Sequence, residues 1–330
     1  MAAGLRLYED ILNQPQSLAG VIARQTGVGR AALLEAAALI CGARRVIFSG
    51  MGASLFASIP LEYYLASHGV AAAFVETGEL LHYRAEQCRD AVVVLLSRSG
   101  NTVEVTKLLA ILKDRGNLVV GVTNEADSTL ALEADVTILV GSARDELVAI
   151  QTYTGTVAAL LLLGAAVTGE RVNLEGLLEP LATTIQRYAA ESLEWQTFFE
   201  DTGVVYLLAR GPSMASAIEG ALLFNETAKL PTVPIAAGGF RHGPVEVVDA
   251  RFRGFLFASQ DATRDLDRQL ASDITRFGGR VQLIHNDVAS AILEIVPVQF
   301  AALRVAEWRD IALGRFRYVS AVTLSESSFA

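Results

Sequence analysis

Short apolar runs rich in Val and Ile recur along this chain, and longer stretches with helical spacing of apolar positions lie between them. Uninterrupted apolar runs are typical of strands buried on both faces, and intervening helices indicate a parallel sheet covered on both sides. The runs that predict strands are Arg45–Ser49, Ala72–Val75, Ala91–Leu96, Leu118–Thr123, Val136–Val140, Val204–Ala209, Pro231–Ile235, Gly254–Ala258 and Val281–Ile284.

The second group of runs repeats the plan of the first, which predicts an internal duplication. Gly52 and Ser54 follow the first run at a strand-to-helix turn, and Gly211 and Ser213 follow the sixth run at the same spacing. We therefore predict two doubly wound α/β units, each a three-layer, flavodoxin-like parallel sheet with helices on both faces. The predicted boundaries are a helical extension at 1–29, a first domain at 30–172, a helical connector at 173–202 and a second domain at 203–330.

Hydroxyl side chains gather where the run Ala91–Leu96 gives way to a helical stretch, in the segment Ser97-Arg98-Ser99-Gly100-Asn101-Thr102. A helix N-terminus offers unpaired N–H donors and partial positive charge, and Gly100 permits close approach of the backbone. Ser97, Ser99 and Thr102 add O–H donors, so the segment predicts a phosphate site. The alternative is an ordinary strand end followed by a helix cap, because Ser and Thr also favour caps.

Composition narrows the function classes. The net charge of −9 and the lack of a basic, aromatic-rich cluster argue against a nucleic-acid surface. The longest nearly apolar stretch, Val157–Val167, is too short to span a bilayer, and no secretory leader opens the sequence. Cys41 and Cys88 give no disulfide framework, and four dispersed histidines do not make a zinc site. We expect a cytoplasmic protein that uses no metal and binds neither nucleic acid nor membrane.

Nucleotide cofactors are also disfavoured. The turn Gly50-Met51-Gly52 lacks the third glycine of a dinucleotide fingerprint, since Leu55 stands in its place. The chain contains no Gly-x-x-x-x-Gly-Lys-Ser/Thr sequence either. We therefore expect no cofactor.

Four motifs in order carry a family resemblance: Gly50-Met-Gly-Ala-Ser54, Ser97-x-Ser-Gly-x-Thr102, Glu219-Gly-Ala-Leu with Glu226, and Phe240-Arg-His-Gly-Pro244. Together they resemble tandem SIS (sugar isomerase) proteins. That family includes the isomerase half of glucosamine-fructose-6-phosphate aminotransferases and stand-alone phosphosugar isomerases, amino-sugar-phosphate deaminases and fructosamine-phosphate deglycases. The resemblance covers residues 30 to 330.

The resemblance implies roles for individual residues. Ser97, Ser99 and Thr102 would hold the sugar phosphate, and Glu226 would shuttle a proton between the carbons that flank the carbonyl. His242 would open the sugar ring, usually from a neighbouring subunit, which implies at least a homodimer with a shared active site. The remaining residues expected to line the same pocket are Gly52, Ser54, Arg98, Gly100, Asn101 and Glu219.

Departures from the family pattern affect the reaction. The lysine that forms an imine in the tail of the aminotransferases is replaced by Ser320, and a second family lysine is replaced by Leu223. No glutaminase-like segment precedes the first unit, so we do not expect glutamine-dependent amidotransfer. Ring opening and proton transfer through an enediol or enolamine remain, which predicts an isomerase of a hexose or amino-hexose 6-phosphate that could also deaminate it. The alternatives are a fructosamine-phosphate deglycase and a non-catalytic phosphosugar sensor.

Plainer interpretations of the second-half residues stay open at this stage. Glu226 has the alternative of a surface carboxylate on an amphipathic helix, because charged groups normally face water. Glu219 lies nearly two helical turns before it and either orients Glu226 or pairs with Arg241. His242 precedes Gly-Pro, where a structural turn at a helix start is the competing explanation.

Overall fold

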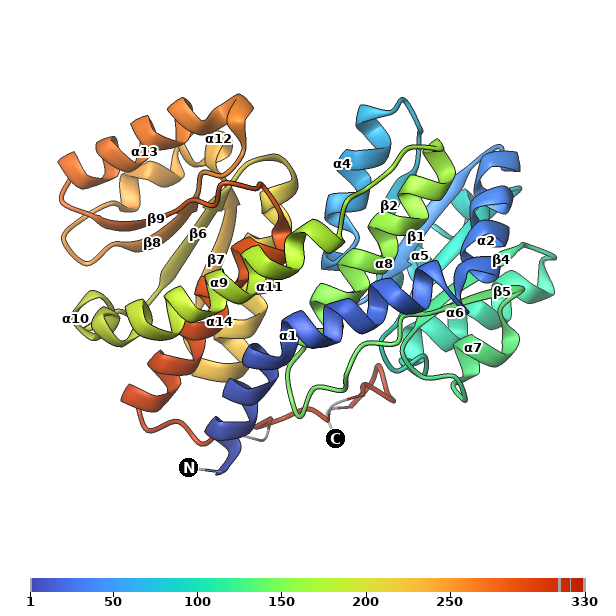
Figure 1. Ribbon diagram of the computed structural model, residues 1–330, viewed down its shortest axis with the longest axis horizontal. Helices are drawn as coiled ribbons and strands as arrows, with labels where there is room; N and C mark the ends of the chain where they lie inside the picture. The colour runs from blue at the N-terminus through green and yellow to red at the C-terminus, as the bar shows by residue number, and fades with distance from the viewer. Residues whose placement is uncertain (1, 314–315, 321, 329–330) are drawn as a thin grey trace. The chain divides into compact units, whose positions relative to one another are not determined.

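The computed structural model describes residues 2–313, 316–320 and 322–328, and these fold into two compact units. The first unit consists of Gln16–Arg144, Gln151–Leu178 and Phe316–Ala330, and the second consists of Met1–Pro15, Asp145–Ile150 and Glu179–Arg315. Each unit contains one parallel sheet with helices packed on it (Figure 1). The two doubly wound α/β units predicted from the pattern of apolar runs are confirmed.

The first unit is built on a five-stranded parallel sheet in the order β2-β1-β3-β4-β5. Its strands are β1 (Val46–Gly50), β2 (Ala73–Glu76), β3 (Val92–Leu96), β4 (Val119–Thr123) and β5 (Val136–Leu139). Every residue of β1, β3 and β4 is buried, which is why these strands appear in the sequence as apolar runs without alternation.

Helices cover both faces of this sheet. Leu80 of α5 (Thr77–Tyr83) and Leu108, Leu109 and Leu112 of α6 (Val103–Asp114) form one core with the sheet residues Val93 and Leu95. Val92, Val94 and Leu96 point to the opposite face and are equally buried. The other helices of this unit are α2 (Arg30–Gly42), α3 (Gly52–Phe56), α4 (Ile59–Ser67), α7 (Thr129–Glu133) and α8 (Gln151–Thr168), and α2 and α4 pack on α8.

Helix α8 has the length and composition of a membrane span, but 67% of it is buried inside the protein. A core helix passes the same test, and the apolar stretch Val157–Val167, which is too short to span a bilayer, lies inside α8. Small residues explain the close packing, because a Cβ added at Gly164 would lie 2.6 Å from Leu61 Cδ1 and 2.9 Å from Tyr64 Cδ1.

The second unit repeats the plan on a four-stranded parallel sheet in the order β7-β6-β8-β9. Its strands are β6 (Val205–Ala209), β7 (Thr232–Ala236), β8 (Arg253–Phe257) and β9 (Arg280–Ile284), and its helices include α11 (Met214–Leu223), α12 (Ala237–Phe240), α13 (Arg264–Arg276) and α14 (Ala291–Trp308). All nine strands form at the predicted positions, within a residue or two at each end.

The connector is helical, as the sequence predicts: α9 (Leu178–Glu191), a 3₁₀ turn at Ser192–Trp195 and α10 (Gln196–Phe199) follow one another without a gap. One predicted segment differs from the structure. The described C-terminal residues from Phe316 onward pack with the first unit, not with the second sheet. The long first helix, α1 (Ala2–Thr26), contributes residues up to Pro15 to the second unit and the rest to the first.

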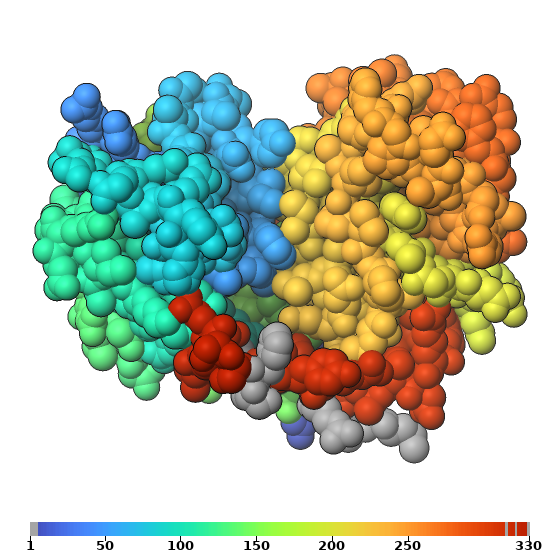
Figure 2. Space-filling model, turned by 180° about the vertical axis from the view of Figure 1, so that it is seen from behind, coloured from blue at the N-terminus to red at the C-terminus, as the bar shows by residue number. Residues whose placement is uncertain are grey.

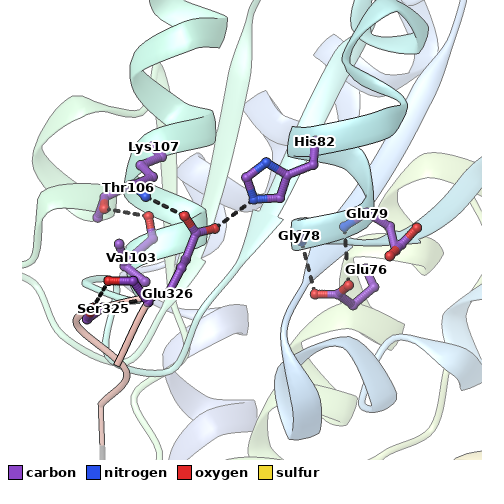
Figure 3. Close-up of polar contacts among 10 residues, drawn as sticks. Glu76, Gly78, Glu79, His82, Val103, Thr106, Lys107, Ser325 and Glu326 are labelled. Atoms are coloured by element: carbon purple, nitrogen blue, oxygen red, sulfur yellow. Dashed lines mark hydrogen bonds and ion pairs between the residues drawn. The ribbon is translucent and has the colours of Figure 1, made fainter. Parts of the chain in front are cut away.

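Hydrogen bonds and an ion pair attach the C-terminal segment to α5 and α6 of the first unit. The backbone N–H of Val103 donates to the carbonyl of Thr323 at 3.0 Å, so the tail binds the first residue of α6. In Figure 2 the C-terminal residues, in red, lie against the part of the first unit that contains α5 and α6. Such contacts between residues more than 200 positions apart, as between Glu326 and the side chains of His82 and Lys107 (Figure 3), have no local sequence signal.

Candidate active site

The predicted phosphate segment lies at the carboxyl ends of β1 and β3, where the strand order of the first sheet reverses. Open parallel sheets bind ligands at this switch point. The turn Met51–Ser54 follows β1, Ser97–Thr102 follows β3, and Gly50 and Leu96 are paired in the sheet. A Cβ at Gly50 would lie 2.9 Å from the Leu96 carbonyl oxygen, so the two strands approach too closely here for any other residue. Gly52 has a φ of 48°, in the left-handed region.

Hydrogen bonds hold the hydroxyls of this loop together. Ser97 Oγ accepts from the N–H of Gly100 at 3.1 Å and lies 3.1 Å from Thr102 Oγ1. Ser54 Oγ accepts from the N–H of Arg98 at 3.2 Å, which links the two turns. Ser99 is half-buried, and its Oγ accepts from the N–H of Asn101 at 3.3 Å. The structure therefore brings Ser54, Ser97, Ser99 and Thr102 into one hydroxyl-rich loop at the N-terminus of α6.

Asn101 lies in the loop, but its side chain turns toward the next helix. Its Oδ1 accepts from the N–H of Thr129, the first residue of α7, at 3.0 Å. The carbonyl of Arg98 is held by Thr123 Oγ1 at 3.1 Å and by the N–H of Asn124 at 3.1 Å. These contacts anchor the loop to β4 and α7, so its shape is set before any ligand binds.

The second unit carries the predicted acid–base residues on an irregular helix. Helix α11 runs into a π-helical turn at Phe224–Ala228, and Glu226 lies in its middle, half-buried. The turn ends at Lys229, whose φ of 50° is left-handed and whose Nζ donates to the carbonyl of Glu226. Single π turns inside helices are rare and frequent at functional sites. This geometry speaks against the alternative of a plain surface carboxylate on an amphipathic helix.

Glu219 is a fully buried carboxyl group, and neither of its side-chain oxygens has a hydrogen-bond partner among the described residues. Burial raises the pKa of Glu219 well above its usual range, and the carboxylates of Glu226 and Asp145 raise it further. Burial thus favours the neutral form of the Glu219 carboxyl group over the ionised form. Of the two alternatives for Glu219, the pair with Arg241 is wrong, because Arg241 lies on the surface and pairs with Asp273 at 3.4 Å.

Asp145 belongs to the same charge cluster, and the sequence analysis missed it. It lies in the short segment Asp145–Ile150, where its Oδ2 accepts from the N–H of Ile150 at 3.0 Å. Asp10 of α1 accepts from the N–H of Glu146 at 3.0 Å, and burial raises the pKa of Asp10 to about 6, helped by Asp145 and Glu146. No periodicity in the sequence marks these residues, since three separate chain segments meet here.

His242 is exposed, in the turn between α12 and the 3₁₀ turn Pro244–Val247. The following residue, Gly243, has a φ of 124°, a conformation that side chains rarely adopt. Pro244 occupies the first position of the 3₁₀ turn, where its missing N–H costs nothing. The Gly-Pro pair thus has a structural role, and it leaves the imidazole of His242 on the surface.

The second sheet has its own switch-point turn, and there the carboxyl group of Glu294 accepts the hydrogen bond of the serine hydroxyl. Ser213, the counterpart of Ser54, donates from its Oγ to Glu294 Oε1 at 2.9 Å and accepts from Gln260 Nε2 at 3.2 Å. Glu294 is fully buried in α14, and burial raises its pKa to about 7. A single acidic residue within the apolar run Ala291–Val298 was the signal that could have revealed it.

Comparison with known proteins decides the family. The SIS domain family matches residues 39–168 and 199–295, one segment on each sheet. The chain belongs to the SIS domain family. It is 30% identical over 270 residues to glutamine–fructose-6-phosphate aminotransferase (isomerizing) from Aeropyrum pernix, an alignment that covers 78% of this chain and 43% of the relative. The SIS chain thus spans less than half the length of this curated relative.

Solved structures share the fold across the whole SIS chain. Glucosamine-6-phosphate deaminase from Thermotoga maritima superposes with a TM-score of 0.82 at 20% identity, covering 96% of this chain and 99% of that one. Tagatose-6-phosphate ketose/aldose isomerase from Escherichia coli gives 0.77 at 19% identity, covering 94% and 95%. At this level of identity the likeness shows the fold alone.

Proposed function

We propose that this SIS protein is an aldose/ketose isomerase of a hexose 6-phosphate or amino-hexose 6-phosphate, which also releases the amine from an amino-sugar substrate. The observation that carries the proposal is the carboxyl pair on the irregular end of α11. There Glu226 lies on a π-helical turn near the buried Glu219, whose pKa is raised by burial and by the charge of Glu226. Isomerisation requires a carboxylate that takes a proton from one carbon and returns it to the next, in surroundings that tune its pKa.

In this proposal the hydroxyl-rich loop binds the phosphate. Ser97, Ser99 and Thr102 donate hydroxyl hydrogen bonds, and the N-terminal end of α6 adds partial positive charge. Ser54 and the turn at Gly52 line the same site, while the half-buried side chain of Arg98 lies within the loop.

The acid–base steps belong to the second unit. His242 opens the ring by moving a proton from the anomeric hydroxyl to the ring oxygen. Glu226 then takes the proton from C2, which gives an enediol or, from an amino sugar, an enolamine, and returns a proton to C1. With an amino sugar this leaves an imine at C2, and water hydrolyses it to the ketose and ammonia. The raised pKa of Glu219 favours its neutral form, which adds no second negative charge beside Glu226 while the enediol forms. We further propose a cytoplasmic homodimer in which the partner subunit supplies the ring-opening histidine. No step in this scheme uses a cofactor.

A panel of sugar phosphates tests the proposal. Purified protein is incubated with hexose 6-phosphates and amino-hexose 6-phosphates, and with fructosamine 6-phosphates, and ketose, ammonia and free amine are assayed separately. Glu226→Gln should lower turnover at least about 100-fold, the usual contribution of a general base, while sugar-phosphate affinity changes less than twofold. The matched control is Glu200→Gln, an exposed glutamate of the same unit, which should retain full activity.

The outcomes separate the functions. Ketose formation or ammonia release that depends on Glu226 supports the isomerase or deaminase, and amine release from fructosamine phosphates alone identifies a deglycase instead. Tight binding of a sugar phosphate with no turnover would show a sensor, in line with Ser320 and Leu223 at the two family lysine positions. Equal turnover by Glu226→Gln and the wild type would reject the assignment of the base.

A further inference from the structure

Helix α11 ends at a residue that is seldom found in this position. Its last turn, Phe224–Ala228, is π-helical and contains Glu226, and the left-handed residue that follows is Lys229, with a φ of 50°. Helices that end at a left-handed residue usually carry glycine or asparagine there, because a Cβ is unfavourable in this conformation. A lysine at this position therefore points to a role for its side chain that offsets the backbone strain.

The backbone hydrogen bonds at this helix end span more residues than usual. In the common endings, the N–H of the left-handed residue bonds to the carbonyl three or four positions earlier. Here the N–H of Lys229 bonds to the carbonyl of Phe224, five positions earlier, and the N–H of Leu230 bonds to the same carbonyl at 3.3 Å. A bond across five positions defines a π-helical turn. The backbone of Lys229 thus closes the turn that contains Glu226.

The side chain of Lys229 supplies a bond that its backbone does not make. Glu226 lies three positions earlier, so its carbonyl is one of the two usual acceptors for the N–H of the left-handed residue. In this structure the carbonyl accepts from Nζ of Lys229 instead. A charged donor makes a stronger hydrogen bond than a neutral one, and positive charge is favoured at the C-terminal end of a helix. Glycine in this place would remove the strain and also the contact.

The start of the π-helical turn is fixed by the core of the second unit. Phe224 is fully buried, and its ring centroid lies 5.9 Å from that of Phe199 and 6.5 Å from that of Phe255. The acceptor carbonyl of Phe224 is therefore held in place, and Lys229 binds the turn at its other end. Glu226 lies between these two fixed points.

The type of turn decides the direction of the Glu226 side chain. Successive residues of an α-helix are rotated by about 100° around the axis, and a π-helical turn contains one residue more than an α-helical turn. A helix end of the common kind would therefore turn the carboxylate of Glu226 away from its present direction. Glu219, which precedes the π-helical turn in α11, would keep its place.

We propose that Lys229 is a positioning residue for Glu226. Its ammonium group holds the carbonyl of Glu226 and so maintains the π-helical turn that directs the carboxylate. The inference rests on the proposed function for the reaction that Glu226 serves. Such a residue affects the rate and not substrate binding, because a displaced general base slows proton transfer while the contacts to the phosphate are unchanged.

Steady-state kinetics and urea denaturation of two variants test the proposal. Lys229→Gly removes the backbone strain and the ammonium group together, so its urea midpoint should lie close to that of the wild type, while kcat falls at least about tenfold and KM stays within about twofold. Lys229→Arg keeps a charged donor and should recover most of kcat. The matched control is Asp201→Gly, at an exposed left-handed position of the same unit with a φ of 55°, which should keep both kcat and KM.

Crystal structures of the two variants give a readout that does not need turnover. In Lys229→Gly the N–H of residue 229 should bond to a carbonyl three or four positions earlier, and the Glu226 side chain should be displaced, whereas Lys229→Arg should keep the π-helical turn. An unchanged turn or an unchanged kcat in Lys229→Gly, or no recovery of kcat in Lys229→Arg, overturns the proposal. Lys229→Met replaces Lys229→Gly if that variant does not fold. If the wild type converts no sugar phosphate, the proposed function fails, and the crystal structures alone decide whether Lys229 positions Glu226.

Discussion

Gly100→Ala is the substitution that tests the shape of the hydroxyl-rich loop most directly. Gly100 has a φ of 64°, and alanine in this left-handed conformation costs about 1–2 kcal/mol. The new Cβ would also lie 2.0 Å from Ser128 Oγ and 2.4 Å from Ser128 Cβ. Ser128 cannot easily move, because its Oγ caps α7 at Ala131 and donates to the carbonyl of Glu125 at 2.7 Å. Relieving such overlap costs a further ~1–3 kcal/mol.

The matched control is Gly116→Ala. Gly116 has a similar φ of 75°, but no atom lies within 4 Å of an added Cβ, so the variant carries the backbone cost alone. In urea denaturation Gly100→Ala should be less stable than Gly116→Ala by about 1–3 kcal/mol. Its affinity for fructose 6-phosphate, measured by calorimetry, should fall at least tenfold, while that of Gly116→Ala stays within twofold.

The double variant Gly100→Ala with Ser128→Gly checks the cause. It removes both atoms that the new Cβ would overlap, so it should recover the steric part of the lost stability relative to Gly100→Ala, less the loss of the α7 cap. Equal stability of Gly100→Ala and Gly116→Ala would refute the reasoning. It would mean that the loop and α7 adjust without cost, and that the loop is not a preformed site.

Two further predictions follow from buried and paired carboxyl groups. Because the folded pKa of Glu294 is raised from 4.5 to about 7, the wild type loses stability as pH rises through this interval. Glu294→Gln should therefore gain about 3 kcal/mol relative to the wild type between pH 4 and pH 8 in urea denaturation, and an unchanged difference would contradict the burial argument. Glu326→Gln weakens the contacts with His82 and Lys107, so trypsin should cut after the exposed Arg317 several-fold faster than in the wild type. Equal cutting rates would show that other contacts hold the tail.

The sheets were predictable because each strand carries its own signal. A strand buried on both faces must be apolar at every position, as Val92–Leu96 and Arg253–Phe257 show, apart from Arg253 at its start. The side chain of Arg253 is instead engaged by backbone carbonyls, at 2.8 Å from Ala250 and 2.9 Å from Phe252. Residues of the hydroxyl-rich loop were also predictable. Hydroxyl side chains and a glycine that directly follow a strand indicate an anion site from neighbouring sequence positions alone.

The features that the sequence did not predict, the 3₁₀ turn within the connector and the position of the C-terminal tail, depend on contacts between segments that are distant in the chain. Within the helical connector the change from α-helix to 3₁₀ turn lies at Ser192, a buried residue to whose Oγ Arg304 Nε donates from α14 at 3.4 Å. The tail joins the first unit through Glu326 and Thr323, which bind residues of α5 and α6. Helical or strand periodicity carries no information on such pairs, because it describes only neighbours along the chain.

The two halves of the duplication differ in the hydrogen bonds that the serine hydroxyl of the switch-point turn makes, Ser54 in the first unit and Ser213 in the second. In the first unit Ser54 Oγ accepts from a backbone N–H of the loop and leaves its own proton for another acceptor. In the second unit the proton of Ser213 goes to Glu294, a carboxylate that the chain provides from α14. The carboxyl oxygen of Glu294 thus already accepts the hydroxyl hydrogen that a phosphate oxygen would need in this turn. The backbone plan is thus kept in both halves, and one buried glutamate accounts for the proposed phosphate site lying in the first unit alone.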